Sequence, residues 1–503
     1  MKIFSAETIK EIDQQTITHE PIDSIDLMER AAEAVVSELI GRFGRDRHFV
    51  VFAGQGNNGG DALAVARILI ENGYRVETFL FNPHKKLSDE CEFNKQRLLE
   101  LTQASFIEVI STFDPPPLNE RTVVIDGLFG IGLSRPLSGG YISLVDYINE
   151  SDATVVSIVI PSGLFCEDNR ENNPRHIIRA DLTLTFQFPK LAFLLADNAP
   201  YIGEWKILDI GLSPRAIYEA KSNVRYLEKE EVGMLLRPRQ RVSHKGNYGH
   251  ALIVAGSMGM MGACILSVKA CLRSGAGLVS THIPQCGYPI LQTAVPEAMV
   301  HTDFSETHIT DVGGVIEYDA LGIGPGIGRE YETVQALKRI LSQLKRPCVL
   351  DADALNIIAE HRECLHSIPP GSILTPHPRE MMRLVGECGS SIDLMIKAID
   401  LAKQMNVVIL LKGANSVVIS PSGRCSFNST GNAGMATGGS GDVLTGMITA
   451  LLAQGYPSEE AAIIGMYVHG LAGDLALQTE SHESLIPSDI IAHLGRAFNL
   501  LKK

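Results

Sequence analysis

The sequence predicts an α/β protein of two domains, each built on a largely parallel sheet. Short β-rich runs that end in glycine or aspartate recur along the chain, and amphipathic segments such as GDALAVARILIENG (60–73) and SVKACLRSGAG (267–277) separate many of them. Such alternation is typical of strands joined by helices. The length of 503 residues also exceeds what one hydrophobic core supports.

Each half of the chain supplies four of the expected strands. They are HFVVFAG (48–54), RVETFLF (75–81), TVVIDG (122–127), TVVSIVI (154–160), HALIVAGS (250–257), PCVLDAD (347–353), SILTPH (372–377) and VVILLKG (407–413). Between the halves, segment 227–246 is dense in charge and carries a proline, so we expect it to be a connection. We place the domains at 1–222 and 223–503, with ligands beyond the carboxyl ends of the strands.

The composition excludes several classes of protein. With 45% hydrophobic and 20% charged residues, the chain is an ordinary globular protein. Its 58 acidic and 44 basic residues give a net charge of −14, which argues against a nucleic-acid partner. Residues 1–10 hold no apolar signal core, and the apolar stretch 251–268 is interrupted by glycine, serine and methionine, so we expect no membrane partner.

The nine cysteines form no CxxC pair, which favours packing thiols over a disulfide scaffold or a zinc site. We therefore expect a cytoplasmic protein that acts on small molecules and forms a homo-oligomer.

The first glycine-rich turn, GQGNNGGDALAVARIL (54–69), follows a strand and opens a helix. Gly54, Gly56 and Gly59 match G-x-G-x-x-G, a spacing that suits dinucleotide phosphates at a helix N-terminus. The next strand ends at Phe81-Asn82 without the acidic residue expected to bind a ribose. An ordinary nicotinamide dehydrogenase site is therefore not favoured.

Polar side chains also gather at three strand ends in this half. They are the cluster 57–61 (NNGGD), Asp126 and Ser162. Their oxygens suit a hard monovalent or divalent cation. The same residue types dominate ordinary turns, so spacing alone leaves both interpretations open.

Several motifs together resemble the NAD(P)H-hydrate epimerase domain over roughly residues 1–215. They are MERA (28–31), GNNGGD (56–61), DGLFGIGLSRPL (126–137), IPSGL (160–164) and TFQFPK (185–190). The resemblance implies a Rossmann-like three-layer domain that interconverts the C6 epimers of hydrated NADH or NADPH. It assigns the hydrate to Asn57, Asn58, Gly59, Gly60, Asp61, Gly130, Ile131, Gly132, Leu133, Ser134, Arg135 and Pro136. It assigns potassium to Asn58, Asp126 and Ser162.

One position departs from that family. The family pattern is D-I-P-S-G, with the aspartate facing the hydrate, whereas this chain has Val159 at that hydrate-facing position. Because valine accepts neither a proton nor a hydrogen bond, we expect the domain to bind the hydrate and to epimerise it slowly. A non-catalytic ligand-binding module is the alternative.

The second glycine-rich turn is TGNAGMATGGSGDVLTG (430–446), directly before an apolar helix. Gly438, Gly439 and Gly441 expose backbone amides that, with the helix N-terminus, form an anion hole for phosphoryl oxygens. Asp442 is placed to accept a proton from a hydroxyl that attacks the phosphoryl group. The alternative is a helix N-cap, which explains Asp442 without explaining the glycines.

This G-x-G-D turn resembles that of the ribokinase-like fold, and further motifs resemble the ADP-dependent NAD(P)H-hydrate dehydratase across roughly 225–503. They are the stretch 245–279, GIGPGIG (322–328), DADALN (351–356), LTPHPRE (374–380) and LKGANSVV (411–418). The resemblance implies dehydration of the S-epimer back to NADH or NADPH, with ADP as co-substrate and Mg²⁺. It assigns the adenine nucleotide to Lys412, Gly413, Ala414, Asn415, Ser416 and Gly441, and the hydrate to Ala263, Gly326, His377 and Asp442. Asp351 and Asp353 either approach the substrate or cap a helix.

Both halves thus predict a bifunctional NAD(P)H-hydrate repair enzyme. Hydroxide is a poor leaving group, and phosphoryl transfer from ADP to the C6 hydroxyl would replace it with phosphate. The rival hypothesis is a thiazole- or pyrimidine-type kinase of the same fold with a non-catalytic N-terminal module. A stable phosphorylated product would indicate the kinase, and recovered NADH the repair enzyme.

Overall fold

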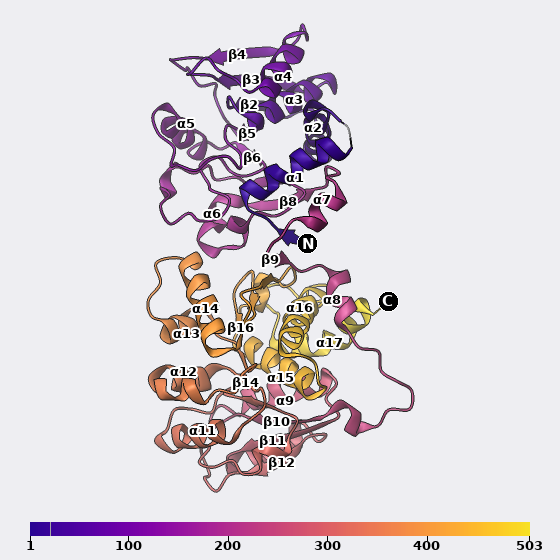
Figure 1. The fold of residues 1–503 in the computed structure, drawn as a ribbon, viewed down its shortest axis with the longest axis vertical. Helices are drawn as coiled ribbons and strands as arrows, with labels where there is room; N and C mark the ends of the chain where they lie inside the picture. The colour runs from indigo at the N-terminus through magenta and orange to yellow at the C-terminus, as the bar shows by residue number, and fades with distance from the viewer. Residues whose placement is uncertain (21, 503) are drawn as a thin grey trace. The chain divides into compact units, whose positions relative to one another are not determined.

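The computed structural model describes residues 1–20 and 22–502. The chain divides into two compact units, one from Lys2 to Ser222 and one from Asn223 onward together with Met1. Each unit is an α/β body in which helices flank a sheet (Figure 1). The predicted α/β class with largely parallel sheets is confirmed.

The N-terminal unit contains a seven-stranded, fully parallel sheet in the order β4-β3-β2-β5-β6-β7-β8. Its strands are β1 (Lys2–Ile3), which lies outside that sheet, β2 (His48–Ala53), β3 (Arg75–Phe81), β4 (Ser105–Val109), β5 (Thr122–Gly127), β6 (Thr154–Ile158), β7 (Leu182–Phe186) and β8 (Glu204–Leu208). Its helices are α1 (Ala6–His19), α2 (Ser24–Arg42), α3 (Asn57–Glu71), α4 (Asp89–Leu99), α5 (Gly140–Asn149), α6 (Ala199–Ile202) and α7 (Pro214–Glu219).

Alternate side chains of β2 fill the cores on the two faces of this sheet, because successive residues of a strand point to opposite sides. Phe49 and Val51 pack with α2 and α3, whereas Val50 and Phe52 pack with α5. The result is a three-layer, Rossmann-like arrangement. The strand order reverses between β2 and β5, and ligands of such sheets bind at this switch point.

In the C-terminal unit the strand order is β9-β18-β17-β16-β15-β14-β13-β10-β11-β12. The strands are β9 (Val224–Tyr226), β10 (His250–Val254), β11 (Leu278–Ile283), β12 (Met299–Thr302), β13 (Ala320–Ile323), β14 (Val349–Leu350), β15 (Ile373–Leu374), β16 (Val408–Leu411), β17 (Val417–Ile419) and β18 (Cys425–Phe427). From β16 to β12 every neighbouring pair is parallel, and β17 is antiparallel to both of its neighbours.

The helices of this unit lie on both faces of its sheet (Figure 1). They are α8 (Lys229–Leu235), α9 (Met261–Arg273), α10 (Tyr288–Ala294), α11 (Tyr331–Gln343), α12 (Ala352–Glu360), α13 (Pro378–Val385), α14 (Ser391–Met405), α15 (Ser440–Ala453), α16 (Ser458–Ala476) and α17 (Pro487–Leu501). Helices α15 and α9 pack closely: a Cβ added at Gly446 of α15 would lie 2.0 Å from the Ser267 carbonyl oxygen of α9. This close approach fixes the middle of α15 against α9.

The charged segment 227–246 is only partly the connection that its composition suggests. Leu227 and Val232 are fully buried in the core that α15, α16 and α17 share, so the first part of the segment belongs to the C-terminal unit. Helix α8 buries Val232 and leaves Lys229 and Glu230 exposed, a division that composition alone conceals.

All nine cysteines are free, and seven of them are buried, which fits packing thiols. Among the described residues, no helix is both long enough and apolar enough to cross a bilayer.

Candidate active sites

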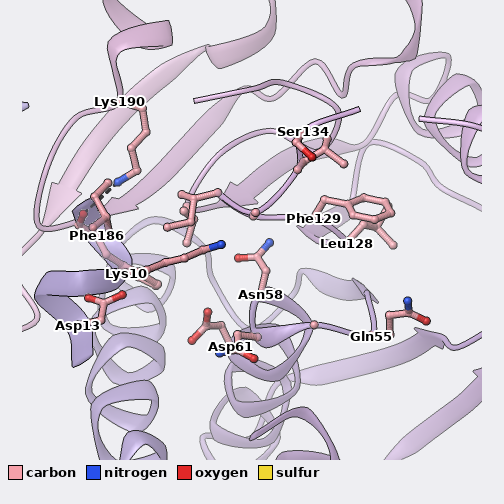
Figure 2. Close-up of a pocket in the computed structure, with 18 of the residues that line it drawn as sticks. Lys10, Asp13, Gln55, Asn58, Asp61, Leu128, Phe129, Ser134, Phe186 and Lys190 are labelled. Atoms are coloured by element: carbon pink, nitrogen blue, oxygen red, sulfur yellow. Dashed lines mark hydrogen bonds between the residues drawn. The ribbon is translucent and has the colours of Figure 1, made fainter. Parts of the chain in front are cut away.

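A cavity of about 670 Å³ opens at the switch point of the N-terminal sheet, beyond the ends of β2, β5, β6 and β7. Figure 2 shows side chains from α1, from the start of α3 and from the loop after β5 directed into it. Of the predicted hydrate-binding residues, those that line it are Asn57, Asn58, Asp61, Gly130, Ile131, Gly132, Leu133, Ser134, Arg135 and Val159. Gly59, Gly60 and Pro136 are not part of the lining.

Gly54 and Gly59, next to this cavity, allow two backbone segments to pack closely. A Cβ added at Gly59 would lie 1.7 Å from the Gly54 carbonyl oxygen, and one added at Gly54 would lie 1.9 Å from that of Leu128. The glycines therefore allow the β2–α3 turn and the loop after β5 to meet at the switch point. Their role is to shape the cavity from behind.

Asn58 and Asp61 stand on the first turns of α3, and both are buried. The amide oxygen and nitrogen of Asn58 have no hydrogen-bond partner within the described part of the chain. Burial, together with the nearby carboxylates of Asp13 and Glu90, raises the pKa of Asp61 well above its ordinary value. Unpaired buried polar groups are costly, so Asn58 marks this part of the cavity as a candidate ligand site.

Asp126, the residue before the last of β5, lies in a dense hydrogen-bond network. Its Oδ2 accepts from the Ser157 hydroxyl at 2.7 Å and the Ser162 backbone N–H at 2.8 Å, and its Oδ1 accepts from the Ser162 hydroxyl at 2.5 Å and the Leu128 N–H at 3.3 Å. Burial raises the pKa of Asp126 despite these hydrogen bonds. The structure thus joins Asp126 to Ser162, the two strand-end oxygens that the sequence placed near a cation.

Val159 lines the cavity in a strained conformation. Its φ is 71°, in the left-handed region that a β-branched residue rarely adopts. The Ile160 N–H donates to the Ile158 carbonyl oxygen at 2.9 Å, which makes Val159 the centre of a γ-turn. The turn aims this side chain at the cavity, so the departure from the family pattern lies at the site itself.

Three titratable residues that the sequence analysis did not assign also line the cavity: Lys10, Asp13 and Lys190. Lys10 and Asp13 lie on α1, and Figure 2 shows the Lys10 amine directed toward Asn58. Lys190 is the last residue of the motif TFQFPK, and its position as a polar residue after a strand could have identified it as a site candidate. No sequence pattern could have identified Lys10 and Asp13, because the packing of a helix across the end of a strand leaves no characteristic spacing.

In the C-terminal unit, the predicted site residues follow five neighbouring parallel strands. Gly326 follows β13, Asp351 follows β14, His377 follows β15 and Lys412 follows β16, while Ala263 lies on α9 after β10. Since these strands are adjacent and parallel, the residues share one edge of the sheet. A Cβ added at Gly326 would lie 3.3 Å from Cβ of Ala263, which brings these two predicted hydrate contacts together.

Asp442 lies in the first turn of α15 but is not its cap. The N-cap is Gly439, whose φ of 97° suits glycine, and Asp442 is the third helical residue. Burial raises the pKa of Asp442 to about 7, and the negative charge of Asp351 adds to the effect. Because the N-cap of α15 is Gly439, the N-cap interpretation of Asp442 is wrong. A carboxylate with a pKa near neutrality suits a general base.

Lys412 and Thr445 converge on Asp351. The Lys412 ammonium donates to Oδ1 at 2.8 Å, and the Thr445 hydroxyl donates to Oδ2 at 2.6 Å. A Cβ added at Gly441 would lie 3.2 Å from the Lys412 Nζ, so the glycine turn sits directly over this amine. Asp351 is the N-cap residue of α12 but accepts from these two residues and makes no side-chain capping bond to the helix. Side-chain capping is therefore wrong for Asp351, and its approach to the substrate stays a prediction.

The remaining predicted contacts lie in two loops. His377 is the N-cap of α13, where its Nδ1 accepts from the Arg379 N–H at 3.1 Å, and burial beside Lys412 lowers its pKa. Gly413, Ala414, Asn415 and Ser416 form the turn between β16 and β17, in which the Ser416 hydroxyl oxygen accepts from the Gly413 N–H at 3.1 Å. Thr445, one helical turn after Gly441, was missed by the sequence analysis.

Two family models match the chain. The model described as NAD(P)H-hydrate dehydratase matches residues 251–496, and that described as YjeF-related protein N-terminus matches residues 24–192. A protein of Thermofilum pendens named bifunctional NAD(P)H-hydrate repair enzyme is 34% identical over 522 aligned residues, which cover 100% of this chain and 97% of that protein. The protein of the same name from Moorella thermoacetica is 34% identical over 515 residues, covering 98% and 96%.

The chain belongs to the bifunctional NAD(P)H-hydrate repair enzyme family. Among solved structures, a ribokinase-like superfamily protein of Enterococcus faecalis is 28% identical, with a TM-score of 0.50, and covers 56% of this chain and 98% of its own. The C-terminal unit of this repair-enzyme family member therefore has the predicted ribokinase-like fold.

Proposed function

We propose that this protein repairs hydrated NADH and NADPH, with ADP-dependent dehydration in the C-terminal unit and interconversion of the hydrate epimers in the N-terminal unit. Family membership supports the pairing of these activities. The observation that carries the dehydratase assignment is Asp442, a carboxylate with a pKa of about 7 set beside the glycine turn and the Lys412 ammonium.

The arrangement suits phosphoryl transfer to the C6 hydroxyl of the hydrate. Asp442 accepts the hydroxyl proton, and the amides of the turn that precedes α15 stabilise the charge on the phosphoryl group. Lys412 and Gly441 would contact the nucleotide phosphates, with Ala263, Gly326 and His377 around the hydrate. Phosphate then leaves as the ring nitrogen lone pair assists, and loss of a C5 proton restores the dihydropyridine.

Mg²⁺ fits this site as a companion of the nucleotide. Among the described residues, no cluster of three or more histidine, cysteine or acidic side chains forms a ready metal cage. Mg²⁺ usually binds through phosphates, water and one or two carboxylates, and Asp353, close enough to raise the pKa of Asp442, is one such carboxylate. The ion would neutralise phosphate charge.

K⁺ fits part of the N-terminal site. The unpaired amide oxygen of Asn58 is a suitable ligand, and Gly127 and Gly130 lie against this residue. Asp126 already accepts four hydrogen bonds, so a cation there would compete with the Ser162 hydroxyl proton. When bound, the ion would compensate the buried charge of Asp126.

The kinase alternative is not better supported than repair, because the chain matches the repair family over its whole length. The test gives the purified full chain a mixture of hydrate epimers with ADP or ATP, and follows each epimer by chromatography together with NADH absorbance. Recovery of NADH with no lasting phosphorylated product is the expected result. A stable phosphorylated hydrate, or no reaction, would contradict the proposal.

A further inference from the structure

Epimerisation at C6 needs proton transfers that Val159 cannot perform. C6 carries a hydroxyl and is bonded to the ring nitrogen, so its configuration is lost when the hydroxyl leaves as water and regained when water returns. The first step requires an acid and the second a base. Resting on the epimerase half of the proposed function, we propose that Lys190 is this acid and Asp13 this base.

Both residues belong to the cavity that Val159 lines, and they enter it from different elements. Asp13 lies on α1, and its carboxylate has no hydrogen bond or ion pair to any of the residues that the structure describes. Lys190 follows β7 and is 1% exposed. Figure 2 shows the two side chains on the same side of the cavity. A carboxylate without a hydrogen-bond partner and a buried amine that line the same ligand cavity have few purely structural explanations.

The backbone around Lys190 holds its amine in place. Its Nζ donates to the carbonyl oxygens of Phe186 at 3.2 Å and Phe188 at 2.9 Å. These carbonyls flank Gln187, whose φ of 56° places it in the left-handed region, and the Phe188 N–H donates back to the Phe186 oxygen at 2.6 Å. Since an ammonium has three N–H groups, one remains for a ligand. The strained turn therefore orients the amine.

The surroundings bring the pKa values of Asp13 and Lys190 close to neutral pH. Burial raises the pKa of Asp13 to about 6, although the positive charge of Lys190 opposes this rise. Burial lowers the pKa of Lys190 to about 8, a shift that the Cys166 thiol and Asp13 partly offset. At neutral pH Asp13 is therefore mostly ionised and Lys190 mostly protonated, as a base and an acid require.

The other cavity carboxylates are less suited to these roles. Burial and the carboxylates of Asp13 and Glu90 raise the pKa of Asp61 well above its ordinary value, which favours its protonated, hydrogen-bond-donating form. Asp126 has all of its acceptor positions engaged. Lys10 offers a positive charge for the dinucleotide phosphates.

Epimerisation proceeds by loss of water from C6 and its return to the opposite face. The Lys190 ammonium protonates the C6 oxygen as the C6–O bond breaks, water leaves, and the nitrogen lone pair forms the C6–N1 double bond. A second water attacks the opposite face of C6, the double-bond electrons return to nitrogen, and Asp13 takes the proton that this water loses. Proton return from Asp13 to Lys190 resets the site, and the reverse reaction uses the same groups.

The experiment gives the full chain both epimers with excess ADP and follows each by chromatography. The first epimer is the S-hydrate, which the C-terminal unit dehydrates directly, and the second is the R-hydrate, which must be epimerised first. In contrast to the slow epimerisation expected from Val159 alone, this proposal predicts that the unmodified protein consumes the second epimer well above the uncatalysed rate. Asp13→Asn and Lys190→Met should slow that phase by about 10²–10⁴-fold, to a floor set by spontaneous interconversion. Lys190→Arg should stay slow as well, because guanidinium is too weak an acid. Dehydration of the first epimer should not change.

Matched controls are Glu11→Gln, an exposed carboxylate on the same helix, and Lys86→Met, an exposed lysine. The single tryptophan, Trp205, lies in the N-terminal unit, so its fluorescence reports whether that unit is folded. If Lys190→Met loses the native fluorescence, the variant is unfolded and the proposal is tested by Asp13→Asn alone. A folded Asp13→Asn variant that epimerises at the wild-type rate would overturn the assignment of the acid and the base, but not the epimerase function. An unmodified protein that leaves the second epimer at the uncatalysed rate would overturn the epimerase function together with it.

Discussion

The Lys412 ammonium lies 2.8 Å from Asp351 Oδ1 and 4.0 Å from Glu380 Oε2, at the end of the central strands of the C-terminal sheet. Burial alone would lower the pKa of Lys412, and the two carboxylates raise it above its ordinary value instead. The amine therefore stays charged where nucleotide phosphates are proposed to bind.

Asp442→Asn should lower the dehydration rate by about 10²–10⁴-fold, because the amide cannot accept the hydroxyl proton. Binding of ADP should change little, since the backbone amides of the turn remain. Steady-state rates and calorimetric ADP titration measure the two effects. Asp400→Asn, an exposed carboxylate on α14, is the control. Turnover close to that of the unmodified protein would exclude Asp442 as the base.

The dehydration rate should fall as pH drops below about 7, because Asp442 acts only when ionised. Asp351→Asn removes a negative charge that raises the pKa of Asp442, so the acid limb should move to lower pH. Lys412→Met removes the opposing positive charge and should move it to higher pH, while raising the ADP concentration required. Asp353, the third charged residue that affects the pKa of Asp442, is unchanged in both variants. Rate–pH profiles that shift in the same direction would contradict this account.

Asp442→Asn should also stabilise the folded protein at alkaline pH. Because folding raises the pKa of Asp442, the stability that this group contributes is complete below the unfolded pKa of about 4 and is lost as pH rises through about 7. Asparagine has no such loss. We expect a gain of roughly 1–3 kcal/mol near pH 8 and almost none near pH 4, measured by thermal denaturation. Equal gains at both pH values would indicate another cause.

Gly59→Ala should disrupt the N-terminal unit, because the added methyl would lie 1.7 Å from the Gly54 carbonyl oxygen. We expect a destabilisation of more than about 3 kcal/mol, visible as altered Trp205 fluorescence. Dehydration of the first epimer should persist, since the C-terminal unit has its own cores. Gly56→Ala is the control, because a Cβ there meets nothing within 4 Å. Native fluorescence in Gly59→Ala would refute the packing argument.

Local sequence was sufficient to predict the fold class and to propose candidate residues for each site. Parallel strands buried on both faces appear as apolar runs, and TVVIDG (122–127) became β5 with the same bounds. The glycine turns were recognisable because few other residues tolerate such close backbone approach or left-handed φ. Asp442 and Lys412 stand in those motifs, so their positions were predictable.

Tertiary structure alone decided which distant residues meet and how they are charged. Asp13 and Lys190 lie on elements far apart in the chain, and only the packing of α1 across the end of the sheet brings both to one cavity. The left-handed φ of Val159 and Gln187 contradicts their local preferences, and the surrounding sheet imposes it. Burial then sets the pKa values of Asp13, Lys190 and Asp442, because the cost of placing a charge in a low-dielectric interior depends on every neighbour that excludes water.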